Sequence, residues 1–232
     1  GCSSLQNLDG LIEWNTSEVI EFNYMFTGCS SLKNLNGLKD WKAPNASIFS
    51  NMFRGCSSLQ NIDGLKNWGV LKASELSWMF EGCSSLKNLD GLKEWKFDDR
   101  YALDTHTNNF SNMFKGCSSL KNLDGLKEWN ISGKIKLSNN FSYMFEGCSS
   151  LQNLDGLKNW NYDSNCYYFN GLEGMFKNCI SLKDINGLKN WNVYYCNNFK
   201  DMFNGCSSLE NAEVVNNWTI CYEYTNLYGI NR

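Results

Sequence analysis

Proline, histidine and any excess of basic residues are what this sequence has little of. Its 232 residues include one proline and one histidine, and the formal net charge is -3. The scarcity of proline excludes a proline-rich linker, and the acidic balance excludes the clustered basic face that nucleic-acid binding needs. No apolar run approaches the roughly 18–20 residues of a membrane-spanning helix. We therefore expect neither nucleic-acid binding nor membrane insertion in this segment.

Motifs of catalysis are missing as well. No GxSxG, HExxH or glycine-rich phosphate loop occurs, and the cysteines do not form the C-x-x-C pairs of zinc sites. The single histidine, His106, could bind a metal ion together with Asp98, Asp99 and Asp104, but a solvated loop is the favoured interpretation. We predict no enzymatic activity, no cofactor and no metal site.

What the sequence does have is repetition, as "FSNMFKGCSSLKNLDGLKEW" at residues 110–129 illustrates. Gly-Cys steps (once Asn-Cys) begin at residues 1, 28, 55, 82, 116, 147, 178 and 205, which defines eight units, the first and last incomplete. A repeat of this length is typical of a solenoid, in which each unit buries its apolar face against its neighbours. The chain opens within a unit, so we expect it to be part of a longer protein.

The spacing of apolar residues predicts the structure of one unit. In residues 22–29 Phe, Met, Phe and Cys fall at i, i+3, i+4 and i+7, which indicates a short α-helix with one buried face. In "CSSLKNLDGL" we expect a strand of about three to five residues, with Leu120 and Leu123 facing inward, before an Asp-Gly corner. One tryptophan then closes each unit.

Stacking such units would align equivalent residues into ladders of leucine, phenylalanine and methionine, cysteine and tryptophan. The predicted fold class is a leucine-rich-repeat-like solenoid of about eight stacked coils, each with a short β-strand and a short helix, of the α/β horseshoe type. We expect a single domain over residues 1–232, with 207–232 as an atypical C-terminal coil or cap.

Eleven cysteines could suggest a disulfide framework, but eight of them occupy one slot of the repeat. We interpret these eight as small buried apolar residues. They are Cys2, Cys29, Cys56, Cys83, Cys117, Cys148, Cys179 and Cys206. Cys166 and Cys196 lie outside this slot, six and five residues after the tryptophans of adjacent coils, and could form a disulfide.

Two polar residues also recur once per unit. An asparagine slot (Asn7, Asn34, Asn61, Asn88, Asn122, Asn153 and Asn211, with Asp184 once) is expected to hydrogen-bond the backbone of the next coil. An aspartate slot (Asp9, Asp63, Asp90, Asp124 and Asp155, interrupted by Asn36 and Asn186) could hold calcium. Ordinary Asp-Gly corners neutralised by nearby lysines are the favoured interpretation of that slot.

Three consecutive units carry longer connections after the tryptophan, at residues 96–109, 130–140 and 161–171, where the other complete units have seven residues. Insertions at one slot of a solenoid lie on one edge, which is often the binding face. The candidate binding residues are Asp98, Asp99, Arg100, Tyr101, Asp104, His106, Lys134, Lys136, Tyr162, Tyr167, Tyr168 and Phe169, with Tyr194 and Tyr195 in the next connection. Tyrosine beside asparagine and aspartate suits protein recognition and sugar stacking alike, although these loops could also be merely tolerated surface.

The core "MFxGCSSLxNLDGLxxW" resembles the BspA-like surface-protein repeat, the Mycoplasma-type branch of about 26 residues among leucine-rich repeats. This resemblance covers essentially the whole chain and implies a non-enzymatic adhesion or interaction protein at a cell surface or outside the cell. We expect a recognition module whose partner is a protein or glycan of another surface. The alternative is a structural block of a filament, fibre or virion surface that self-associates through its repeats.

Overall fold

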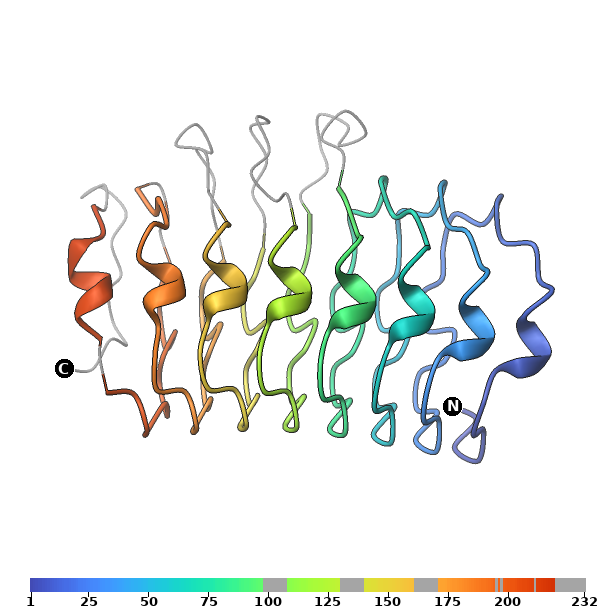
Figure 1. Ribbon diagram of the computed structural model, residues 1–232, viewed down its shortest axis with the longest axis horizontal. Coiled ribbons are helices and arrows are strands. Elements are labelled where there is room, and N and C mark those ends of the chain that lie inside the picture. The colour runs from blue at the N-terminus through green and yellow to red at the C-terminus, as the bar shows by residue number, and fades with distance from the viewer. Residues whose placement is uncertain are drawn as a thin grey trace.

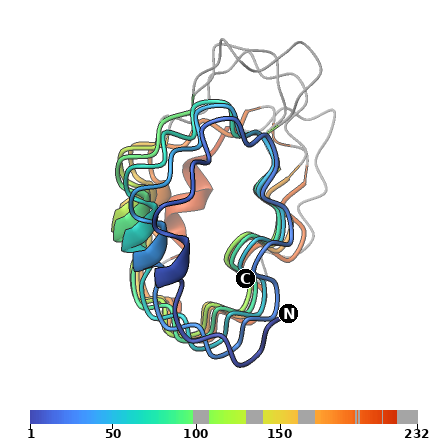
Figure 2. The same ribbon diagram turned by 90° about the vertical axis from the view of Figure 1, so that its right-hand side faces the viewer.

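The computed structural model describes residues 1–97, 108–129, 140–160, 171–194, 196, 198–210 and 212–219. Successive coils lie side by side along one stack (Figure 1), and a view along the stack shows them superposed as loops of similar outline (Figure 2). Each short helix contacts only the helices of adjoining coils. The predicted leucine-rich-repeat-like solenoid is confirmed.

Each described coil carries one 3-10 helix at its corner. These are η1 (Asp9–Leu11), η2 (Asn36–Leu38), η3 (Asp63–Leu65), η4 (Asp90–Leu92), η6 (Asp124–Leu126), η7 (Asp155–Leu157), η8 (Asn186–Leu188) and η9 (Glu213–Asn217). In most coils the preceding asparagine starts the helix, as where the Asn88 Oδ1 accepts a 3.1 Å hydrogen bond from the Asp90 backbone N–H. Such an Asx turn mimics a backbone turn.

The prediction that these asparagines bond the next coil is therefore wrong. The side chains of Asn7, Asn34, Asn122 and Asn153 accept from the backbone two residues onward in their own coil, and Asp184 does the same. Asn211 lies outside the described residues. This local hydrogen bond closes a short ring between the side chain and its own backbone, so the side chain does not need to extend to the next coil. Asn61 is an exception, since its buried Oδ1 has no hydrogen-bond partner among the described residues.

The predicted α-helix over residues 22–29 is also wrong. We name the structure found there the turn ribbon; it comprises residues 21–28, 48–55, 75–82, 109–116, 140–147, 171–178 and 198–205. Alternate backbone N–H groups leave the coil: those of Phe22, Tyr24, Phe26 and Gly28 donate to the carbonyls of Ile48, Ser50, Met52 and Arg54 at 2.7–3.0 Å. The N–H groups between them donate three residues back, as Met25 does to Phe22. The segment is a run of overlapping β-turns.

Each turn ribbon contains two residues with positive φ, four positions apart. The first is usually not glycine: Tyr24, Asn51, Trp78, Asn112, Tyr143, Gly174 or Asp201, at φ 56–60°. The second is glycine except for Asn178, at φ 60–79°. A left-handed residue in the third position is what a type II turn requires. A left-handed residue also interrupts an α-helix. The helix-like spacing of apolar residues in this segment therefore indicates which residues are buried and does not indicate a helix.

Extended strands are absent from the described part of the chain, where isolated parallel bridges replace the predicted ones. Bridges join Glu21 to Ile48 and continue through Glu75, Asn109 and Asn140, while Asn153 pairs with Asp184. Leu120 and Leu123 are nevertheless fully buried, as the pattern predicted. The coils bond to one another in short steps because turns interrupt every extended stretch.

The tryptophans hold neighbouring coils together in two ways. Their rings stack, with centroids 6.3 Å apart for Trp95 and Trp129 and 6.2 Å for Trp129 and Trp160. From Trp41 onward, the indole N–H of each tryptophan that closes a unit donates to the corner leucine carbonyl of the preceding coil at 2.8–3.3 Å. Burying a tryptophan is favourable only when its N–H finds such a partner.

Phenylalanines and cysteines form the remaining ladders. The rings of Phe53, Phe80 and Phe114 stack at 5.5 Å between centroids. Cysteines 29 to 179 of the repeat slot are buried thiols, and the Sγ of Cys83, for example, donates to the Phe53 carbonyl at 3.2 Å. The interpretation as small core groups is confirmed for these six, whereas Cys2 is exposed and Cys206 is only partly buried.

Candidate functional site

The three insertions start and end at points that lie side by side in the described residues. They follow Trp95, Trp129 and Trp160, whose rings are stacked on one another. They rejoin the coil near Asn109 and Asn140, which form one parallel bridge. The prediction that these connections leave one edge of the stack in consecutive coils therefore holds for their anchor points.

The core beneath that edge is closed by the described residues. Trp95, Trp129 and Trp160 are each at most 2% exposed. Phe97, the second residue of the first insertion, lies edge-on against Trp129 with centroids 5.0 Å apart. The core ladders thus run through these three coils without interruption.

Most predicted binding residues lie outside the described residues. This applies to Asp98, Asp99, Arg100, Tyr101, Asp104, His106, Lys134, Lys136, Tyr162, Tyr167, Tyr168, Phe169 and Tyr195. Tyr194 is described and has 38% of its surface exposed. The grouping of these side chains into one binding patch stays a prediction.

The predicted disulfide between Cys166 and Cys196 also stays a prediction. Cys196 is buried, with 4% of its surface exposed, but Cys166 lies outside the described residues. The Val193 carbonyl accepts a 2.9 Å hydrogen bond from the Cys196 backbone N–H.

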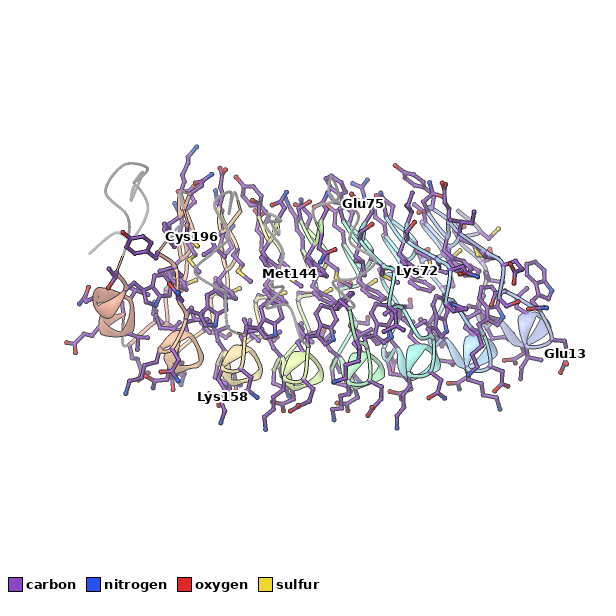
Figure 3. All side chains as sticks on the ribbon, turned by 90° about the horizontal axis from the view of Figure 1, so that it is seen from above. Glu13, Lys72, Glu75, Met144, Lys158 and Cys196 are labelled. Atoms are coloured by element: carbon purple, nitrogen blue, oxygen red, sulfur yellow. The ribbon has the colours of Figure 1, made fainter. Side chains whose placement is uncertain are left out.

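The helix side of the solenoid presents ordered charges. Lys158 points away from the stack on this side, whereas Glu75 lies on the opposite side (Figure 3). The corner aspartates are exposed, and Lys93 pairs with Asp90 at 2.7 Å, which raises the pKa of Lys93. No group of three or more possible metal ligands forms anywhere in the described ranges.

The opposite side, formed by the turn ribbon, has charges that pair between successive coils. Ion pairs join Arg54 to Glu81 at 2.6 Å and Lys115 to Glu146 at 2.8 Å. Lys177 binds Asp201 at 3.2 Å, and hydrogen bonds from Lys177 and then Asn204 lower the pKa of Asp201. The charges alternate in sign along the stack, so each neutralises the next.

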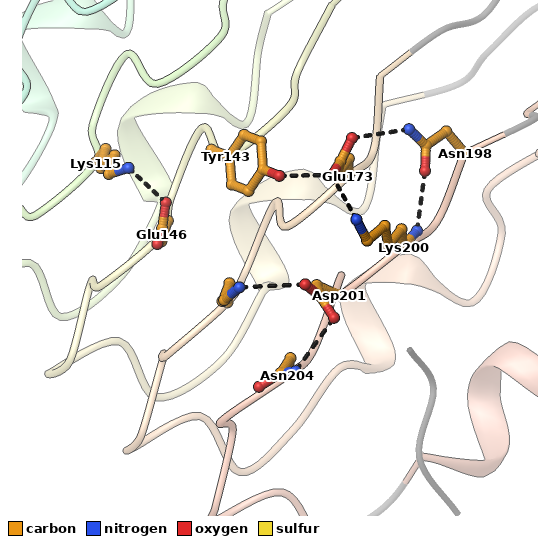
Figure 4. A network of polar contacts seen from close by, with 9 residues as sticks. Lys115, Tyr143, Glu146, Glu173, Asn198, Lys200, Asp201 and Asn204 are labelled. Atoms are coloured by element: carbon orange, nitrogen blue, oxygen red, sulfur yellow. Dashed lines mark hydrogen bonds and ion pairs between the residues drawn. The ribbon is translucent and has the colours of Figure 1, made fainter. Parts of the chain in front are cut away.

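Two glutamates of the turn ribbon are centres of polar clusters. Glu173 accepts hydrogen bonds from the Tyr143 hydroxyl at 2.6 Å and from the Asn198 amide at 3.0 Å, and it lies 3.9 Å from Lys200 (Figure 4). The bond to Glu173 raises the pKa of Tyr143 to about 12. Glu75 accepts from Ser50, Ser77 and Asn109.

A stripe of aromatic side chains on this side was not predicted from the sequence. Tyr24, Trp78 and Tyr143 occupy the first left-handed position of the first, third and fifth turn ribbons. Asn51 and Asn112 occupy the same position in the coils between them. The alternation of aromatic residue and asparagine at this position is visible in the sequence. It was missed because the segment was predicted to be a helix, in which this position has no special conformation.

In the described part of the chain, no helix is long and apolar enough to cross a membrane.

One protein family and several solved structures are similar to this chain. The family described as "Mycoplasma protein of unknown function, DUF285" matches residues 2–106 and 108–227. The leucine-rich repeat protein TpLRR of T. pallidum is similar at 19% identity and a TM-score of 0.44, over 83% of this chain and 72% of that one. No protein of curated function matches the sequence.

Two further crystal structures are similar at lower scores. A leucine-rich repeat protein from Eubacterium ventriosum has 16% identity and a TM-score of 0.31, over 83% of this chain and 57% of that one. A leucine-rich cell surface protein from Faecalibacterium prausnitzii has 13% identity and a TM-score of 0.28, over 97% of this chain and 75% of that one.

Proposed function

The chain belongs to the DUF285 family of Mycoplasma proteins, and we propose that it is a non-enzymatic recognition module that binds a protein or glycan of another surface. This membership confirms the resemblance to BspA-like repeats. We place the protein at the cell surface or outside the cell, as that resemblance implies. Binding would occur at the edge from which the three insertions at residues 96–109, 130–140 and 161–171 emerge.

The alignment of the insertion anchors carries this proposal. Three consecutive coils depart from the seven-residue connection, and their anchors are adjacent. The core ladders run through these coils as they do through the coils with regular connections. The extra residues are therefore not needed to build the core, and we propose that they serve binding. Several weak contacts held at fixed spacing gain affinity over any one of them, because the scaffold has already ordered them.

Replacing the insertions tests the proposal. The connection at residues 69–75, "GVLKASE", fills the same slot in a regular coil. In the trimmed variant, this seven-residue connection replaces each of the three insertions. In the control, the same connection replaces residues 42–48, which have equal length. Both are checked by circular dichroism and then measured on cultured epithelial cells and a printed glycan panel.

We expect the trimmed variant to fold and to lose binding, and the control to keep it. Equal binding by both variants would remove the insertions from the recognition site. A folded wild-type protein that binds neither the cells nor any glycan would reject the recognition function itself.

A further inference from the structure

The turn ribbon bears three aromatic side chains in a backbone conformation that is unfavourable for them. Tyr24, Trp78 and Tyr143 have φ of 59°, 56° and 59°. A bulky residue in the left-handed region is a genuine outlier, because its Cβ crowds the backbone there. Other coils place asparagine, glycine or aspartate in this slot and fold the same way. Backbone strain of this kind, retained where a relaxed residue would fit, indicates a role for the side chain.

These rings do not belong to the hydrophobic core. Tyr24 is 60% exposed, and Trp78 and Tyr143 are only partly buried. The indole of Trp78 has no ring neighbour, and its N–H has no hydrogen-bond partner within the described residues. Tyr143 is held more firmly, by Glu173 at its hydroxyl and by Lys115 Nζ at 5.7 Å from its ring centroid. The Tyr143 ring also packs against Gly174 of the next coil, where a Cβ would overlap it. The accessible rings of the stripe are therefore those of Tyr24 and Trp78.

The spacing of the rings suits a linear chain of sugars. One coil step in a parallel ladder is roughly 5 Å, so aromatic residues two coils apart lie about 10 Å from each other along the stack. This is close to the length of a disaccharide unit in an extended polysaccharide. Between Trp78 and Tyr143 lies Asn112, whose amide has no partner in the described structure and could bond a sugar hydroxyl.

The charges of the turn ribbon favour a neutral partner. Its sequence holds four cationic residues (Arg54, Lys115, Lys177 and Lys200) and six carboxylates (Glu21, Glu75, Glu81, Glu146, Glu173 and Asp201). All four cations lie within ion-pairing distance of one of these carboxylates. A polyanion would have to break these pairs and would face an excess of negative charge, whereas a neutral chain would leave the pairs intact.

From these observations we propose that the turn ribbon binds a linear, neutral polysaccharide lying along the solenoid axis, with sugar rings on Tyr24 and Trp78. Apolar sugar faces pack on the aromatic rings. The Trp78 indole N–H and the Asn112 amide bond the sugar hydroxyls. The rings lie within the turn ribbon, three residues after the connection ends, and two of them, Tyr24 and Trp78, belong to coils whose connection has the regular seven residues.

The test uses Trp78→Asn, which gives this coil the residue that Asn51 and Asn112 supply in its neighbours. Because asparagine is unstrained there, the variant is expected to unfold at or above the wild-type temperature, so lost binding will not reflect lost folding. Ile180→Ser is the matched control, since it replaces a 50% exposed apolar residue with the serine of the other complete coils. The probes are β-1,4-linked hexasaccharides of glucose and of N-acetylglucosamine, with a heparin fragment as the polyanion.

Calorimetric titration should show binding of at least one neutral hexasaccharide by the wild-type protein. Trp78→Asn should weaken it about tenfold or more, equivalent to about 1.4 kcal/mol, while Ile180→Ser and the protein with trimmed insertions keep wild-type affinity. The proposal is overturned if Trp78→Asn binds as the wild type does, if neither neutral saccharide binds, or if only heparin binds. Loss of binding in the trimmed protein alone would assign glycan recognition to the insertions instead.

Discussion

At the scale of single residues, the glycine of each Asp-Gly-Leu corner is required because adjacent coils lie close together at this point. In the Asp-Gly-Leu corner its φ is negative, so the left-handed region is not the reason for it. A Cβ on Gly91 would overlap the carbonyl of Ile62 in the preceding coil, and the same overlap recurs from Gly37 to Gly187. Gly10 in the first coil has open space around the same position. The glycine therefore sets how closely two coils approach.

The pair Gly91→Ala and Gly10→Ala isolates this effect, because both corners have the same local sequence. We expect Gly91→Ala to lower the free energy of unfolding by about 2–3 kcal/mol, since the backbones must separate to admit the methyl group. Gly10→Ala should change it by less than about 0.5 kcal/mol. Urea unfolding measures both. Equal losses would show that the glycine acts through its own conformation.

The buried thiols give the protein a pH limit. Burial raises the pKa of both Cys56 and Cys148 to about 12, from a model-peptide value near 9. Below pH 9 these thiols are neutral in both states and do not affect the pH dependence of stability. Between pH 9 and 12 they ionise in the unfolded chain but not in the folded one, so stability falls as pH rises.

Alkylation checks this account of the cysteines. In native protein at pH 8, iodoacetamide should modify exposed Cys2 rapidly and leave Cys56, Cys117 and Cys148 unmodified, as peptide mapping by mass spectrometry will show. Unfolding in guanidinium should make all of them reactive. Rapid modification of Cys117 in folded protein would contradict a closed core.

At the scale of elements, the turn ribbon shows why apolar spacing misled. Phenylalanine, methionine, phenylalanine and cysteine at i, i+3, i+4 and i+7 are buried in the inner coils, as a helix would bury them, although Met25 is 41% exposed. Overlapping turns meet the same burial pattern while directing alternate N–H groups to the next coil. In a helix those N–H groups would donate to carbonyls of the same coil, so adjacent coils would lose the backbone hydrogen bonds that join them.

Asn112 distinguishes the two structures, because alanine and glycine rank oppositely in them. At a left-handed position, Asn112→Ala should be less stable than Asn112→Gly by about 1 kcal/mol. In an α-helix the alanine variant would be the more stable by about the same amount. Thermal unfolding of the two variants distinguishes the two structures. A more stable alanine variant would contradict the turn ribbon and support a helix in this segment.

At the scale of the whole molecule, stability should follow from repeated interfaces. Backbone bonds, indole N–H bonds and ring stacking recur between every described pair of adjacent coils. Such a stack behaves approximately as a sum of units and nearest-neighbour contacts. Removing a whole unit should therefore leave a working solenoid, whereas a change of register should not.

Deletion of residues 28–54 removes one complete unit of 27 residues and joins Thr27 to Gly55. We expect a folded protein whose denaturant m-value is lower in proportion to the surface it no longer buries. Deletion of residues 28–56, which also removes the next Gly-Cys step, should disrupt the stack at the junction. Near-ultraviolet circular dichroism of the tryptophan ladder compares them, and equal spectra would mean that register is not essential.

The sequence by itself determined the unit length, the eight-fold stacking, the inward ladders of leucine, tryptophan and cysteine, and the slot of the three insertions. These follow from periodicity and hydrophobicity, which report burial directly. Only the tertiary structure decided that Phe22 begins a turn and not a helix, that Asn88 bonds its own coil, and that Trp78 stands in a strained position on an exposed side. Those outcomes depend on hydrogen bonds between residues mostly 24 to 37 positions apart, where the coil, not the local sequence, fixes which partner is within reach.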